Sequence, residues 1–179
     1  AQDLVESADQ ARPAAYGATP RAYRQLLARD DVEAVLIATP MQLHATMAVD
    51  ALHAGKHVLS EVAAAVTLDE CWDLVHAVRE TGRTYMLAEN VCYYRQNMTV
   101  LEMLRQGLFG PLTYAECGYV HDCRFLLYGP DGKLTWRGEL ARRCSGNWYP
   151  THSLGPVAQW MGINVTDRLE RLVSFSTRS

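Results

Sequence analysis

Polar side chains follow two short apolar stretches, at points where a parallel sheet would bind a ligand. The apolar residues 34–38 lead into a loop that ends at His44, and residues 57–59, a histidine and two apolar residues, lead into Ser60 and Glu61. Ligands of doubly wound sheets bind at the carboxyl ends of the strands, so both loops are candidate site loops. The alternative is that these polar residues only cap the helices that follow.

A second group of reactive side chains comes from the cysteines. They are odd in number and show no CxxC spacing: Cys71, Cys92, Cys117, Cys123 and Cys144. This usage indicates reduced thiols in a cytoplasmic protein. Cys117, His121 and Cys123 are metal-ligand types, but a strand alternates its side chains and no fourth ligand accompanies them, so we expect no metal site.

Composition excludes several classes of function. The 179 residues carry a formal net charge of -3, so the chain lacks the basic surface that nucleic acid or anionic lipid requires. No apolar run approaches the length of a membrane span. We therefore expect no nucleic-acid partner and no membrane partner.

The elements that must position the two loops form a βαβ unit. Residues 34–38 and 57–59 are strands, residues 41–54 between them form an amphipathic helix that Gly55 ends, and residues 84–88 form a third strand. Thr67 followed by Glu70 is a capping box that opens a helix over residues 68–80. These patterns predict a doubly wound parallel sheet.

The pattern changes after Tyr94, so we predict two domains, residues 1–92 and 93–179. In the second, residues 97–106 and 149–161 are expected helices, residues 112–120 and 171–177 are expected strands, and residues 122–148 are a long loop. We expect the two strands to share one sheet, with Tyr119 facing the pocket. The fold class is thus α/β, with a doubly wound parallel sheet in the first domain and an open, mainly antiparallel sheet in the second.

Several spaced motifs resemble those of the glucose–fructose oxidoreductase/inositol dehydrogenase/MocA family of nicotinamide-dependent enzymes. They are Ala-Thr-Pro at 38–40 with His44, AGKHVLSE at 54–61, AEN at 88–90 and GLFGP at 107–111. Within that family, EVA at 61–63 and YPTHSLGP at 149–156 are most similar to the NAD-dependent glycosidases typified by α-N-acetylgalactosaminidase. The resemblance implies a partial Rossmann domain that holds the dinucleotide, followed by part of an α+β domain whose open sheet walls a sugar pocket.

The resemblance also implies roles for individual residues. The cofactor, NAD with NADP left open, would be bound by Thr39, Pro40, Met41, Gln42, Leu43, His44, Glu61, Val62 and Asn90. The sugar or glycoside substrate would contact Tyr119, Arg137, Tyr149, Pro150, Thr151 and His152. His152, Tyr149 and Tyr93 are the implied catalytic residues, because histidine and a perturbed tyrosine transfer protons near neutral pH. A homo-oligomer formed through the second-domain sheet is implied as well.

Three functions remain open at the level of sequence. The first is redox-assisted glycosidic cleavage, in which a ring hydroxyl is oxidised transiently, and NAD-dependent glycosidases are recognised exceptions to the two-carboxylate mechanism. The second is a plain NAD(P)-dependent sugar or cyclitol dehydrogenase, although Val62 and Ala63 stand where many such enzymes have Lys-Pro. The third is a binding module without catalysis.

The family's Gly-rich turn and the acidic residue that binds the ribose are not found in the sequence. We therefore expect an internal fragment that is inactive by itself. Residues 34–38 would then lie at an open sheet edge, which favours association with another chain.

Overall fold

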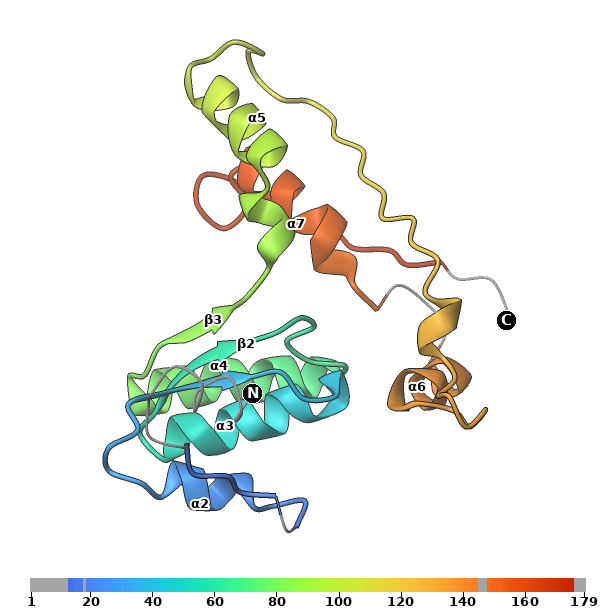
Figure 1. Ribbon diagram of the computed structural model, residues 1–179. Helices are drawn as coiled ribbons and strands as arrows, with labels where there is room; N and C mark the ends of the chain where they lie inside the picture. The colour runs from blue at the N-terminus through green and yellow to red at the C-terminus, as the bar shows by residue number, and fades with distance from the viewer. Residues whose placement is uncertain (1–12, 18, 145–147, 176–179) are drawn as a thin grey trace.

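The computed structural model describes residues 13–17, 19–144 and 148–175. The first half is built on a parallel sheet of three strands in the order β1-β2-β3: β1 (Ala34–Ile37), β2 (His57–Ser60) and β3 (Tyr85–Leu87). The predicted parallel sheet and its three strands are confirmed. Both connections between the strands pass through helices (Figure 1).

Helices cover one face of this sheet. They are α2 (Tyr23–Leu27), α3 (His44–His53), entered through the short 3-10 helix η1 (Met41–Leu43), and α4 (Leu68–Thr81). Figure 1 shows α3 and α4 lying together below the strands. Small residues on α3 allow this close packing, and the core consists of Leu27, Ile37, Ala45, Ala48, Ala51, Leu52, Val58, Leu74 and Ala77.

The predicted capping box at the start of α4 is present. The Glu70 backbone N–H donates to the Thr67 hydroxyl, and the Glu70 carboxylate accepts from the Thr67 backbone N–H at 3.1 Å. This exchange satisfies donors that a helix start otherwise leaves unpaired.

The opposite face of the sheet is open within the described residues. Leu36, Leu59 and Met86 are in register across the three strands, so their side chains form one apolar row. Leu36 is 65% exposed and Met86 is 49% exposed. β1 is also an edge strand of the described sheet, as the sequence predicted.

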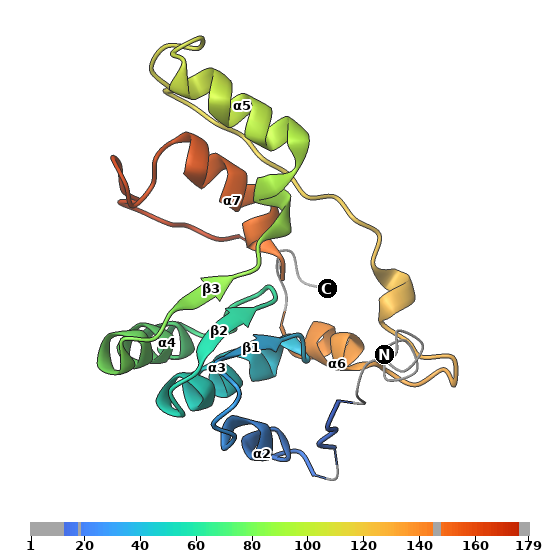
Figure 2. The same cartoon turned by 60° about the vertical axis from the view of Figure 1, so that its left-hand side comes forward.

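The second half is mainly helical. It contains η2 (Asn90–Tyr93), α5 (Arg95–Arg105), η3 (Arg124–Leu126), α6 (Trp136–Arg143) and α7 (Pro150–Trp160). Helices α5 and α7 lie side by side in both Figure 1 and Figure 2. The indole N–H of Trp160 donates to the backbone carbonyl of Asn97 at 3.2 Å, which ties the two helices together. In the described ranges, every helix is too short or too polar to cross a membrane.

The two strands expected in this half were wrong. Residues 112–120 and 171–175 are extended but pair with no strand of the described chain, and positions 176 and 177 lie outside it. Alternating apolar residues suit a strand, but a strand exists only when a neighbour accepts and donates its backbone hydrogen bonds. The open antiparallel sheet is therefore not formed by the described residues.

The loop predicted over residues 122–148 contains helix α6. Thr135 caps it by accepting from the Gly138 backbone N–H at 3.2 Å, and Arg142 and Arg143 lie in its last turn. An N-cap threonine and basic residues at the end are a recognisable helix pattern. The glycines and proline at 129–132 are typical of turns, so they favoured a loop over the whole segment. Figure 2 shows α6 near the end of β1, where it closes one side of the site.

Candidate functional site

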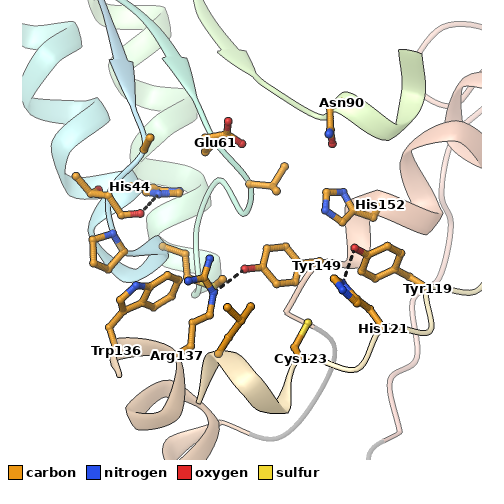
Figure 3. A pocket seen from close by; sticks show the side chains of 16 residues that line it. His44, Glu61, Asn90, Tyr119, His121, Cys123, Trp136, Arg137, Tyr149 and His152 are labelled. Atoms are coloured by element: carbon orange, nitrogen blue, oxygen red, sulfur yellow. Dashed lines mark hydrogen bonds between the residues drawn. The ribbon is translucent and has the colours of Figure 1, made fainter. Parts of the chain in front are cut away.

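A pocket of about 460 Å³ lies where the carboxyl ends of β1 and β2 face the second half. Both candidate site loops border it, as expected for ligand sites of parallel sheets. Its lining residues are Ala38, Thr39, Pro40, Met41, His44, Glu61, Val62, Asn90, Tyr119, His121, Cys123, Leu126, Trp136, Arg137, Tyr149 and His152 (Figure 3).

His44 fixes the loop on the Rossmann side. Its side chain is 1% exposed, and its ring nitrogens lie 2.8 Å from the carbonyl oxygen of Ala63 and 2.7 Å from that of Thr39. Because both nitrogens are engaged by backbone, His44 ties the two strand-end loops to each other and shapes the pocket wall.

An aromatic and imidazole cluster forms the facing wall. The rings of Tyr149 and His152 are stacked, with centroids 5.4 Å apart and an angle of 7° between the planes. The ring of Tyr119 meets His152 edge to face at 4.9 Å. Arg137 lies over the Trp136 ring at 4.2 Å and donates from Nε to the Tyr149 hydroxyl at 3.3 Å. The guanidinium of Arg137 thus holds the Tyr149 phenol beside the imidazole of His152 (Figure 3).

The phenol O–H of Tyr119 is suited to donate a hydrogen bond. Desolvation by its surroundings raises the pKa of the Tyr119 phenol, and the nearby thiol of Cys123 adds to the effect. The phenol therefore keeps its proton near neutral pH. Its oxygen lies 3.0 Å from Nδ1 of His121, which places a second imidazole in the same wall.

Behind the wall, His152 has a buried partner. Its Nδ1 lies 2.8 Å from Oε1 of Glu89, and the two side chains are 13% and 9% exposed. The same carboxylate oxygen accepts from the backbone N–H of Val91 at 3.0 Å. Within the described chain, Nε2 of His152 has no hydrogen-bond partner, so this nitrogen is left for a ligand.

The structure brings most of the residues singled out from the sequence into this pocket. Thr39, Pro40, Met41, His44, Glu61, Val62 and Asn90 line it from the Rossmann side, and Tyr119, Arg137, Tyr149 and His152 from the other.

The remaining candidates lie outside the lining. Tyr93 is 60% exposed, because η2 carries the chain away from the sheet toward α5. Gln42 and Leu43 are in η1, whose Met41 takes the position facing the pocket. Pro150 and Thr151 begin α7, where they position the turn that presents His152.

Sequence reasoning missed several contributors. They are Ala38, His121, Cys123, Leu126 and Trp136 in the lining, and Glu89 behind it. The sequence marks His121 and Cys123 only as metal-ligand types, and the described residues contain no group of three side chains able to hold a metal ion. Trp136 had been placed in a long loop, although its position one residue after a capping Thr was a usable signal.

A parallel sheet with its pocket at the strand ends defines the class of doubly wound, nucleotide-binding α/β proteins. Residues 2–89 match the family described as "Oxidoreductase family, NAD-binding Rossmann fold", and residues 93–179 match "Glycosyl hydrolase 109, C-terminal domain". The first half of the chain thus matches the NAD-binding domain of the GFO/IDH/MocA oxidoreductases, and the second half matches the glycosyl hydrolase 109 C-terminal domain. This confirms the resemblance, the Rossmann fold and the cofactor family predicted from the sequence.

Individual relatives agree with this assignment. The chain is 46% identical over 180 residues to a glycosyl hydrolase family 109 protein 2 of Shewanella sp. (strain ANA-3), covering 100% of this chain and 40% of that protein. It is 44% identical over 167 residues to a family 109 protein of Shewanella pealeana, covering 93% and 37%. Among solved structures, an oxidoreductase domain protein from Kribbella flavida has a TM-score of 0.67 at 28% identity, covering 78% of this chain and 38% of that one. The chain thus spans about 40% of the length of the curated relatives it matches.

Proposed function

We propose that this protein is an NAD-dependent enzyme that acts on a sugar or glycoside at a ring hydroxyl, and that it cleaves the glycosidic bond with redox assistance. One observation carries the proposal: the loops that border the dinucleotide in this class face the Tyr149–His152–Tyr119 cluster across a single pocket. The glycosyl hydrolase 109 match of the second half supports a glycoside as substrate.

The residues present fit a nicotinamide dinucleotide. Glu61 offers a carboxylate suited to ribose hydroxyls, Asn90 offers an amide suited to a carboxamide, and Val62 offers an apolar contact for a ring. Residues 39–44 would border the cofactor along the end of β1. When bound there, NAD supplies reversible hydride acceptance from a ring carbon.

His152 is the proposed proton acceptor of the site. Its Nε2 is available to a ligand, and its ring is held between two tyrosines. Tyr149, positioned by Arg137, is the second proton-transfer group, and Tyr119 donates a hydrogen bond to a sugar oxygen. Together these groups provide the base and the acid that proton removal and departure of the leaving group require.

The pocket favours cleavage over simple dehydrogenation in one respect. Val62 and Ala63 follow Glu61, and the lining contains no lysine, so the described site has no amine to serve as base. The proton acceptors that line it are imidazole and phenol groups and the carboxylate of Glu61, which we assign to the cofactor ribose.

The proposal is tested with nitrophenyl glycosides and with free sugars, using protein expressed from its complete coding sequence. Redox-assisted cleavage releases nitrophenol only when NAD is bound, while the absorbance of NADH stays flat. A plain dehydrogenase instead accumulates NADH with a free sugar and leaves the glycoside intact. Absence of both reactions over a panel of sugars leaves the binding-module alternative and defeats the proposal.

We also propose a homo-oligomer, a cytoplasmic location and a domain boundary near residues 92 and 93. Exposed Tyr114 and Val120 on the extended segment, with Phe109 before it and Phe125 after it, support burial against a second copy, in place of the sheet first expected there. All five cysteines are free, which supports a reducing compartment. Sedimentation of the complete protein tests the oligomer.

A further inference from the structure

Glu89 is a buried carboxylate that lies behind His152, outside the pocket lining. It follows β3, it is absent from the pocket lining, and its side chain is 9% exposed. Burying a carboxylate is costly unless hydrogen bonds compensate it. The groups facing Glu89 are Nδ1 of His152 and the backbone N–H of Val91, and both meet the same oxygen, Oε1. Oε2 is buried and has no hydrogen-bond partner within the described residues.

The geometry assigns to Glu89 the role of a positioning residue that fixes the tautomer and the orientation of His152. This inference rests on the proposed function, in which His152 transfers the proton. A carboxylate accepts hydrogen bonds and does not donate them, so Nδ1 must carry the hydrogen at 2.8 Å from Oε1. In the neutral ring the lone pair then lies on Nε2, the nitrogen left for a ligand.

The Glu89 carboxylate also lies next to the charge that His152 would carry after it accepts a proton. When Nε2 accepts a proton, the electron pair of the broken bond stays on the substrate atom, and an imidazolium forms beside Glu89. In a buried site the attraction between this imidazolium and the Glu89 carboxylate is screened less than in water. The two tyrosine rings restrict where the imidazole can move, and Glu89 restricts how it turns.

The contact joins the two halves of the chain. Glu89 and His152 are separated by 63 positions, and Gly155 on α7 leaves room for the approach. A Cβ atom at Gly155 would lie 3.2 Å from Cγ of Glu89 and 2.8 Å from Sγ of Cys92. A glycine on α7 one turn after His152 is therefore needed for the helix to reach this carboxylate.

The first test reads the tautomer directly and does not require turnover. Nitrogen NMR of histidine-labelled protein, recorded well above the usual titration range of histidine, should show His152 protonated at Nδ1 and bare at Nε2, with His152→Asn supplying the assignment. Glu89→Leu should shift the ring toward the Nε2-protonated form. A bare Nδ1 in the wild-type protein, or an unchanged tautomer in Glu89→Leu, overturns the inference.

The second test measures turnover per folded protein. Glu89→Gln keeps a carbonyl oxygen able to accept from both Val91 and His152, so it should fold even where Glu89→Leu does not. Loss of the charge should lower kcat by about 10- to 100-fold, the usual effect of removing the partner that orients a histidine in a metal site, with KM little changed. A merely structural role predicts lower stability with unchanged kcat, and that result also overturns the inference.

The control is Asp50→Asn. Asp50 pairs with Arg24 at 2.8 Å on the side of α3 that contacts α2, away from the pocket. This variant loses an ion pair yet should keep both the tautomer of His152 and kcat. If wild-type protein turns over no glycoside or sugar, the proposed function fails, while the NMR result still decides the role of Glu89.

Discussion

Side chains around His152 differ in what their polar atoms touch, and that difference assigns their chemistry. Nδ1 of His152 is used by Glu89, whereas Nε2 is left for a ligand. Tyr149 is held by a guanidinium, and Tyr119 keeps its proton. His44, by contrast, has both nitrogens on backbone carbonyls and serves as a tie between loops.

Residue type and local motif found only part of this arrangement. Tyr149 and His152 were predictable because both belong to the YPTHSLGP motif that carries the family resemblance, although Tyr149 is the N-cap of α7 and only His152 lies within the helix. Glu89 was not, since its contact with His152 spans 63 positions and depends on how α7 docks. Patterns within a helix or strand carry no information about such docking.

The thiol of Cys92 offers a pH-dependent test of packing at this junction. Burial raises its pKa, and the nearby charge of Glu89 adds to the effect. A raised pKa lowers the thiolate fraction at any given pH, so alkylation of Cys92 should begin at higher pH than alkylation of the exposed Cys117. Mass spectrometry after iodoacetamide pulses at several pH values measures both sites. Equal onset in the folded protein would contradict the packing, whereas equal onset in denaturant is the expected control.

Among the elements, the βαβ unit was predictable because the sequence patterns that specify it lie within each strand, helix and turn. Short apolar runs, a capping box and a Gly stop gave β1, β2, β3 and α4 within a few residues. Residues 112–120 show the limit of that reasoning. Alternation of apolar and polar side chains predicts which residues would share one face of a strand, but it does not predict that a neighbouring strand is present to pair with it.

The cap of α4 gives a prediction on stability. Thr67→Ala removes the hydroxyl that accepts from the Glu70 backbone N–H, so it should lower the free energy of unfolding by about 1 kcal/mol. Urea denaturation measures the change. Thr99→Ala on α5 is the matched control, because its hydroxyl bonds within a helix and not at a cap, and it should stay within about 0.5 kcal/mol. An equal loss of unfolding free energy in the two variants would show that the capping box adds no stability.

Docking of α7 gives a second prediction. Gly155→Ala places a methyl group against Cys92 and Glu89, and overpacking of this kind costs about 1 to 3 kcal/mol. Because His152 lies on the same helix, kcat should fall together with stability. Gly118→Ala, which meets nothing within 4 Å, should change neither quantity. Wild-type stability and kcat in Gly155→Ala would mean that α7 does not lie this close to Glu89 and to η2.

On the scale of the whole molecule, the open sheet face should govern the behaviour of the 179-residue polypeptide. Leu36 and Met86 are exposed in an apolar row that also contains Leu59, and within the described residues β1 is an edge strand of the sheet, a combination that favours association. Leu36→Lys should therefore lower the weight-average mass measured by light scattering at high concentration. Val165→Lys adds the same charge at an exposed apolar position away from the sheet and should leave the mass unchanged. An equal effect of both substitutions would point to net charge instead of the sheet.

The central claim is that one pocket between the two halves of the chain binds the dinucleotide and carries out proton transfer through His152. Calorimetric titration with NAD and glycoside turnover are measured in parallel on the complete protein and on its His152→Ala variant. The account predicts NAD affinity within a few-fold of wild type and turnover lower by on the order of 100-fold or more, the usual contribution of a positioned proton acceptor. Wild-type turnover in His152→Ala would contradict the account.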